Sequence, residues 1–253
     1  MIYMAFLLFT LIILGIAFYQ WQYFMIFSPT YYREDELDKR FEMLSISTDD
    51  GIELEGVVFT PATFSATLLF FAGRSHDSVG LIKRLSNTFP HVRIITFNYR
   101  SYGRSGGRLN EKNILEDSLK IAQIVRKNYG DFYLLGFSIG SSVASFVASK
   151  ESVRKLFLVG SFDSIQNLAK EKYGLNLSRI FRYKFDNTKF VKEIDTPTYI
   201  FASKSDSTTY IENARELKKH VKNLAFYIEL DDLHHKEILW DAKVVRKINE
   251  ELK

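Results

Sequence analysis

The chain has 253 residues, a formal net charge of +4 and a hydrophobic fraction of 46%. This length suffices for one sizeable α/β domain, and a modest charge without long runs of like charges argues against a nucleic-acid-binding protein. There is no cysteine, which excludes disulfides, thiol catalysis and cysteine-based zinc or iron–sulfur sites. We expect neither a metal nor a cofactor.

The N-terminal segment is strongly apolar. Residues 2–19 carry no charge, and about 20 apolar residues span a bilayer as a helix. Trp21, Tyr23 and Phe24 follow where an interfacial aromatic belt would lie. We predict a membrane anchor over residues 1–28. A cleaved signal peptide is the alternative, although a basic start and a clear cleavage site are missing. A buried core helix is disfavoured because nothing polar marks a solvent-facing side.

The charges around this segment bear on its orientation. No Lys or Arg precedes it, whereas Arg33, Lys39 and Arg40 follow it. Because positive residues favour the cytoplasmic side, we expect a single-pass protein whose globular part faces the cytoplasm.

Residues 29–253 show buried strands alternating with amphipathic helices. A β-hairpin with an Asp-Gly turn is expected over 41–48 and 52–60. Six further strands are expected over 66–73, 92–99, 131–137, 155–162, 196–203 and 224–232. Helices are expected around 76–89, over 111–129 and 210–222, and from 138 and 236 onwards. This alternation predicts a mostly parallel eight-stranded sheet with helices on both faces, and residues 163–192 are the one insertion long enough to form a lid.

The segment "LLGFSIGSSVA" follows the fifth strand and contains Gly136, Ser138 and Gly140 in the spacing Gly-x-Ser-x-Gly. A nucleophilic serine on a sharp strand–helix turn needs small residues two positions away on either side, because larger side chains would clash. The helix beyond it also favours developing negative charge. The pentapeptide alone fits a helix N-cap equally well. Within this order of strands it predicts the α/β-hydrolase fold.

A serine nucleophile needs a base and an acid. His234 and His235 follow the last predicted strand, and Asp206 follows the seventh. The order serine, aspartate, histidine is that expected of this fold. The imidazole takes the serine proton, and the carboxylate fixes its tautomer. The remaining histidines fit no such place: His76, His91 and His220.

An oxyanion hole is expected from two backbone N–H groups. One is that of Ile139, directly after the serine, and the other belongs to the loop "FFAGRSHD" after the third strand. Gly73 and Arg74 form a turn there that can point an amide inward, and Arg74 is the predicted donor. Gly73 also fits a simple strand-ending turn.

Several segments resemble the serine-aminopeptidase-like branch of the α/β-hydrolases, which includes monoglyceride lipases, prolyl-oligopeptidase relatives and membrane-anchored bud-emergence-type hydrolases. "FNYRSYGRSGGRLNE" resembles "DYRGYGRSxGxPSE", "GFSIGSSVA" resembles "GxSLGsavA", and "YFMIFSPT" resembles the "Y…F.PT" junction after the membrane segment of the bud-emergence type. "FFAGRS", "FASKSD" and "DDLHHK" stand where the family has "FHGNAG", "hGxxD" and "GxxHND". The resemblance, from Phe41 to the C-terminus, implies a triad of Ser138, Asp206 and His234, with His235 at a non-catalytic polar position.

The chain departs from this family pattern at three places. Ala72 replaces the usual His, Asn98 replaces the Asp of "DYR", and the Gly before the catalytic His is missing. These departures affect the substrate and the oxyanion loop more than the triad. The resemblance therefore implies a hydrolase without naming a substrate.

These observations predict a membrane-anchored serine hydrolase that cleaves an ester, thioester or amide of a small or lipid-like acyl substrate through an acyl-enzyme. It would be carboxylesterase- or lipase-like, with a peptidase left open. The alternative is a non-catalytic binding or scaffold protein of the same fold. The segment Arg179–Lys192 interleaves basic and aromatic residues. It fits a lid that rests on the membrane better than a nucleic-acid site.

Overall fold

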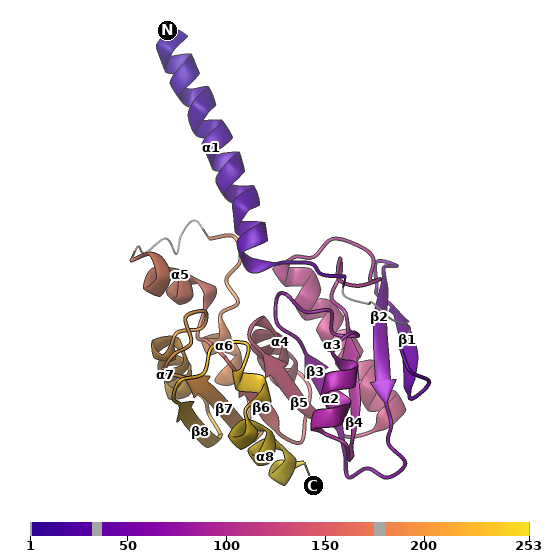
Figure 1. Cartoon of the computed structure of the whole chain (residues 1–253). Coiled ribbons are helices and arrows are strands. Elements are labelled where there is room, and N and C mark those ends of the chain that lie inside the picture. Colours follow the sequence, from indigo (N-terminus) through magenta and orange to yellow (C-terminus); the bar gives the residue numbers. More distant parts are fainter. Residues whose placement is uncertain (1, 32–36, 175–180, 253) are drawn as a thin grey trace.

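An eight-stranded sheet forms the centre of the computed structural model, which describes residues 2–31, 37–174 and 181–252 (Figure 1). The strands lie in the order β1-β2-β4-β3-β5-β6-β7-β8. Their bounds are β1 Phe41–Ser47, β2 Glu53–Phe59, β3 Ala66–Phe71, β4 Val92–Phe97, β5 Tyr133–Phe137, β6 Leu156–Val159, β7 Thr198–Ser203 and β8 Leu224–Leu230. All eight predicted strands are confirmed.

The sheet is antiparallel at one edge and parallel elsewhere. β2 pairs antiparallel with both β1 and β4, and every other neighbouring pair is parallel. The predicted hairpin is therefore confirmed, and Gly51 in its turn has φ 77°. Because the parallel strands point the same way, the loops that follow β3, β5 and β7 meet at one edge of the sheet.

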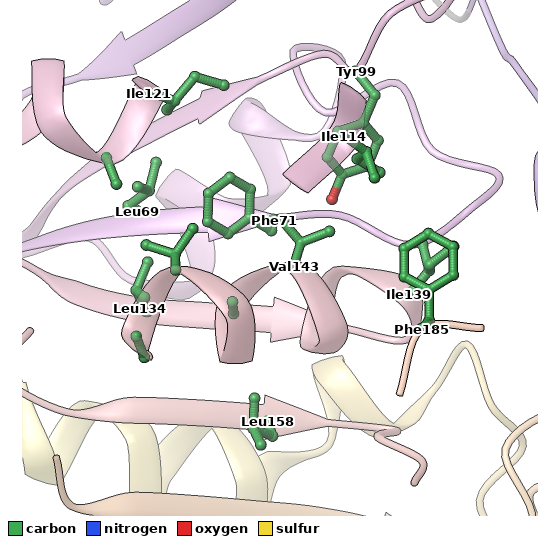
Figure 2. Close-up of a cluster of buried hydrophobic side chains, with 14 of the residues drawn as sticks. Leu69, Phe71, Tyr99, Ile114, Ile121, Leu134, Ile139, Val143, Leu158 and Phe185 are labelled. Atoms are coloured by element: carbon green, nitrogen blue, oxygen red, sulfur yellow. The ribbon is translucent and has the colours of Figure 1, made fainter. Parts of the chain in front are cut away.

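Helices cover both faces of the sheet. The α-helices after the first are α2 Ile82–Thr88, α3 Glu111–Tyr129, α4 Ile139–Ala148, α5 Ile165–Tyr173, α6 Asn187–Val191, α7 Ile211–His220 and α8 Ala242–Glu251. Successive side chains of a strand point to opposite faces. Leu69 and Phe71 accordingly pack beneath α3 and α4 (Figure 2), whereas Leu68 and Phe70 pack with α2 and α8. Both faces are apolar, as the near-continuous hydrophobic strands predict.

Two helices begin later than the sequence pattern indicates. The predicted helix at 76–89 is confined to α2, and the C-terminal segment forms a short 3-10 helix, Ile238–Trp240, before α8. Asp241 separates these two elements with an extended backbone, φ −64° and ψ 138°, and its carboxylate accepts hydrogen bonds from Lys243 N and Val244 N. This N-cap satisfies the free N–H groups of the first turn, so the helix starts at Ala242.

The predicted lid, 163–192, contains α5 and α6, while its residues 175–180, with Arg179, lie outside the described part, as does Arg33. Beyond α5, the aromatic side chains of Phe181, Tyr183 and Phe185 are buried, and Lys184 and Lys189 are exposed. The described part of the basic–aromatic segment, residues 181–192, thus packs these three rings inward.

Helix α1, Ile2–Ile26, stands away from the domain, and only its last turns approach it (Figure 1). Its mean hydropathy over 18 residues is 2.4, and none of that window is buried. The end of the helix is different, because Gln22, Ile26 and the following Phe27 are buried. By length and composition α1 is the one described helix able to cross a membrane, a test that a signal sequence also passes.

Candidate active site

Ser138 lies on the turn between β5 and α4 with φ 56° and ψ −123°, a backbone conformation that side-chain-bearing residues rarely adopt. The flanking glycines make this turn sterically feasible. A Cβ on Gly136 would lie 2.3 Å from the carbonyl oxygen of Gly140, and one on Gly140 would lie 2.0 Å from that of Phe71. Neither site has room for a side chain, so the turn can form only with glycine at both positions.

Ser138 is hydrogen-bonded to a histidine from another loop, and that histidine is hydrogen-bonded to an aspartate from a third loop. His235 Nε2 lies 2.9 Å from Ser138 Oγ, and His235 Nδ1 lies 2.7 Å from Asp206 Oδ2. The ring also stacks on Phe137 at 4.9 Å between centroids. With its proton on Nδ1, His235 donates to Asp206 and leaves Nε2 free to accept the serine proton. This arrangement suits a general base.

The structure places His235 beside Ser138, and not the predicted His234. The side chain of His234 is exposed, and its backbone N–H donates to Glu237 Oε2 at 2.7 Å. The physical reason lies in the turn after β8, where Asp232 has φ 55°. Aspartate tolerates this left-handed conformation, so Asp232 occupies the glycine position of the family pattern "GxxH". Counting three residues from Asp232 reaches His235.

Asp206 is held in a dense set of hydrogen bonds. Its Oδ1 accepts from the backbone N–H groups of Thr208 and Thr209 at 2.7 and 2.9 Å, and its Oδ2 accepts from the Thr209 hydroxyl at 2.6 Å. Burial by itself raises the pKa of Asp206, but the hydrogen bond and charge of His235, together with Thr209, outweigh it and hold this pKa below its usual value. Asp206 is therefore an anion at neutral pH, as an imidazole partner requires. The threonines were not predicted, although Asp-Ser-Thr-Thr is typical of a turn in which the aspartate accepts hydrogen bonds from the residues that follow it.

The predicted oxyanion donors line the same cavity as Ser138. Ile139 is the first residue of α4, so its N–H has no acceptor within the helix. On the other loop, a Cβ on Gly73 would lie 3.2 Å from Ser138 Cβ, so this turn packs tightly against the serine. The Arg74 carbonyl accepts hydrogen bonds from Ser28 N and the Tyr102 hydroxyl. Donation by Ile139 and Arg74 to an oxyanion stays a prediction.

The cavity beside Ser138 has a volume of about 680 Å³. Its lining comes from the loops after β3, β5, β7 and β8, from α5 and from the last turns of α1. His76, which the sequence analysis set aside, is one of the lining residues. Burial lowers the pKa of His76, with the nearby Lys236 and His235 adding to the shift against a hydrogen bond to Gly73, so its imidazole is neutral at neutral pH.

No group of three or more His, Asp or Glu side chains within the described ranges is arranged to hold a metal ion.

An eight-stranded sheet in this order, with a serine on a strained turn between the fifth strand and its helix, defines an α/β-hydrolase fold. A family model described as the alpha/beta hydrolase fold matches residues 67–183. The chain has the α/β-hydrolase fold, and this match over part of its length supports a place in the α/β-hydrolase superfamily.

Curated relatives and solved structures agree with this assignment. A segment of 185 residues is 28% identical to the lysophosphatidylserine lipase ABHD12 of Macaca fascicularis, covering 62% of this chain and 45% of the lipase. An uncharacterised protein of Acanthamoeba polyphaga mimivirus is 26% identical over 191 residues, covering 66% and 65% of the two chains. The matches thus span about half to two thirds of these relatives.

Among solved structures, an esterase of Pyrococcus furiosus superposes with a TM-score of 0.71 at 16% identity, covering 90% of this chain and 96% of the esterase. An acetyl xylan esterase from Paenibacillus superposes with a TM-score of 0.67 at 14% identity, covering 88% and 87%. These structures share the fold with this chain. Together with the family match, the comparisons support a hydrolase.

Proposed function

We propose that the chain is a serine hydrolase that cleaves an acyl ester, thioester or amide through an acyl-enzyme. The observation that carries this proposal is the continuous hydrogen-bonded series Ser138–His235–Asp206 at the wall of a cavity. A non-catalytic protein of this fold has no need for a strained serine aligned with a buried imidazole–carboxylate pair. No feature of the described residues favours the scaffold alternative.

The reaction runs in two halves. Ser138 Oγ attacks the substrate carbonyl carbon while His235 Nε2 takes the serine proton, and Asp206 stabilises the resulting imidazolium. The bond to the leaving group breaks, and His235 returns the proton to the departing alcohol, thiol or amine. A water molecule then attacks the acyl-enzyme by the same route, which releases a carboxylic acid and restores Ser138. The N–H groups of Ile139 and Arg74 are the proposed donors to the oxyanion.

The cavity lining favours an amphiphilic acyl substrate. Its described lining includes three cationic side chains, Arg74, Lys172 and Lys236, and no acidic residue. Apolar and aromatic side chains make up much of the remainder. A substrate with an apolar acyl chain and an anionic head group matches both features, and the lipase relatives, named for lysophosphatidylserine, act on such a molecule. We therefore propose a lipid-like acyl ester as the substrate class.

Helix α1 is the proposed membrane anchor. Its apolar length exceeds a bilayer core, and its residues up to Tyr19 are mostly exposed in the structure. A removed signal peptide would discard the last turns of α1, yet Gln22, Ile26 and Phe27 are buried against the domain. This packing supports a helix that is retained in the mature protein. The globular part is proposed to face the cytoplasm.

Labelling with a fluorophosphonate probe tests the proposed chemistry, because the probe reacts only with an activated serine. The full chain in detergent is expected to be labelled, and Ser138→Ala is expected to abolish labelling. Ser207→Ala is a matched control, since Ser207 lines the same cavity but follows Asp206 rather than β5. Equal labelling of wild type and Ser138→Ala would refute the proposal.

A further inference from the structure

Four residues from the end of α1 line the cavity that contains Ser138: Trp21, Phe24, Met25 and Ile26. On α5, Leu168, Ala169 and Tyr173 line the same cavity. The two helices are in contact there. The rings of Trp21 and Tyr173 are 6.5 Å apart, and the Tyr173 hydroxyl lies 3.7 Å from Met25 Sδ. The helix that would be only a tether in a simple anchored enzyme therefore contributes part of the binding cavity.

The end of α1 is fixed to the domain by specific contacts. Gln22 Oε1 accepts a hydrogen bond from Arg182 N at 2.6 Å. Phe27 packs edge-on against Tyr183 at 5.0 Å between ring centroids. The Arg74 guanidinium donates to the Met25 carbonyl oxygen, which ties the helix directly to the loop beside the serine. These contacts hold the lining residues of α1 in place relative to Ser138.

The lining residues also continue an apolar surface that extends along the helix. At 1.5 Å per residue the 25 residues of α1 measure roughly 37 Å, whereas a bilayer core of about 30 Å takes about 20 of them. A span that starts at Ile2 therefore leaves the bilayer core near Trp21. The residues of α1 that line the cavity begin at Trp21, where such a span would end. In Figure 1 this end of α1 meets the domain, and the rest of the helix stands away from it.

We propose that Trp21, Phe24 and Met25 form the acyl-binding wall of the site. The acyl chain of a membrane-dissolved ester would lie against the lining residues of α1 and α5 and reach Ser138 without crossing water. Its head group would stay near Lys172 and Lys236, which line the same cavity. This inference rests on the proposed hydrolase function and adds that the anchor selects the substrate by its chain.

The test compares two esters in the full-length protein in detergent. Met25→Trp fills part of the proposed chain path, and each buried methylene that is lost weakens binding by roughly a factor of four. The ratio of kcat/KM for p-nitrophenyl laurate over p-nitrophenyl butyrate is expected to fall roughly tenfold or more. Trp21→Ala removes apolar surface from the wall without adding bulk and is expected to lower the same ratio. Leu11→Trp, exposed on the same helix outside the cavity, is the matched control and keeps the wild-type ratio.

The outcomes separate the two proposals. If wild type reacts with a fluorophosphonate and hydrolyses both esters, but Met25→Trp and Trp21→Ala keep its ratio, the wall proposal is overturned and the hydrolase stands. A ratio that falls equally in Leu11→Trp also overturns it, because the effect would then come from the helix in the micelle. If wild type neither labels nor hydrolyses either ester, both proposals fail together.

Discussion

The cavity is built from two unlike groups of residues. The elbow group, which comprises Ser138, Ile139, Asp206 and His235, is buried or nearly so and lies beyond the ends of β5, β7 and β8. Hydrogen bonds join Ser138, His235 and Asp206. The helix group, which comprises Trp21, Phe24, Met25, Leu168 and Tyr173, is apolar or aromatic and partly exposed. Its members lie on α1 and α5, outside the sheet.

Under the proposed function, this difference assigns two separate tasks to the two groups. Bond cleavage needs atoms held to within a fraction of an ångström, and the sheet provides that precision through backbone geometry. Selection of an acyl chain needs apolar area, which helices outside the sheet can supply without disturbing the elbow group. Changes in the elbow group should therefore affect every substrate, whereas changes in the helix group should affect substrates according to their chains.

The largest expected effect comes from the histidine. His235→Ala removes the base and should lower kcat by about 10³- to 10⁶-fold for short and long esters alike. His234→Ala is the matched control. The side chain of His234 is exposed, so its removal should leave kcat within about twofold of wild type. Ester turnover measured on both variants decides between the two histidines. The reverse result would restore His234 as the base and contradict the geometry of the loop after β8.

Asp206→Asn should have the next largest effect, a fall in kcat of about 10²- to 10⁴-fold, because an amide cannot stabilise the imidazolium. Stability should respond as well. The folded-state pKa of Asp206 is lowered, so its anion stabilises the fold above the unfolded value near 3.8, and this contribution is lost as the pH falls below it. The stability difference between wild type and variant should shrink on acidification below about pH 4.

The control for this substitution is Asp231→Asn, whose exposed carboxylate pairs with Lys204 at the surface. Such an exposed pair contributes little to stability, because solvent screens its charges. Thermal unfolding at several pH values, measured beside ester turnover, compares the two variants. A pH-independent stability difference in Asp206→Asn would mean that its charge does not support the fold.

The contrast between the elbow group and the helix group also explains which features could be predicted from the sequence. Six of the eight strands were predictable because they are short apolar runs bounded by turn residues, and β1 and β2 because an Asp-Gly turn marks their hairpin. Ser138 and Asp206 follow strands, so topology brings them to one edge. His234 was predicted where the structure has His235, one residue further on. The left-handed backbone of Asp232 sets this position, and it is a property of the folded turn that the sequence does not reveal.

The helix group was out of reach for a different reason. The apolar pattern of α1 predicts a helix and a membrane span, but the same residues serve equally well against lipid or against α5. Which of them line the cavity depends on contacts between segments distant in sequence, such as Gln22 with Arg182 and Phe27 with Tyr183. The spacing of apolar residues within one segment does not reveal such contacts.

The smallest expected effect tests how firmly the helix group is held. Gln22→Leu removes the oxygen that accepts the hydrogen bond from Arg182 N. Because Gln22 is buried, the loss of this bond should lower the free energy of unfolding by about 1 to 3 kcal/mol. Gln20→Leu makes the same change on an exposed position of α1 and should cost almost nothing. Thermal unfolding of the full chain in detergent measures both.

The Gln22 variant also tests the division between the two groups. Because the elbow group does not depend on this bond, butyrate ester turnover should change less in Gln22→Leu than laurate ester turnover does. A loosened helix end would disturb the chain path while Ser138, His235 and Asp206 kept their hydrogen bonds. Equal losses for both esters would instead mean that the end of α1 supports the chemistry itself, through the bond from Arg74 to Met25, and the two groups would have to be treated as one.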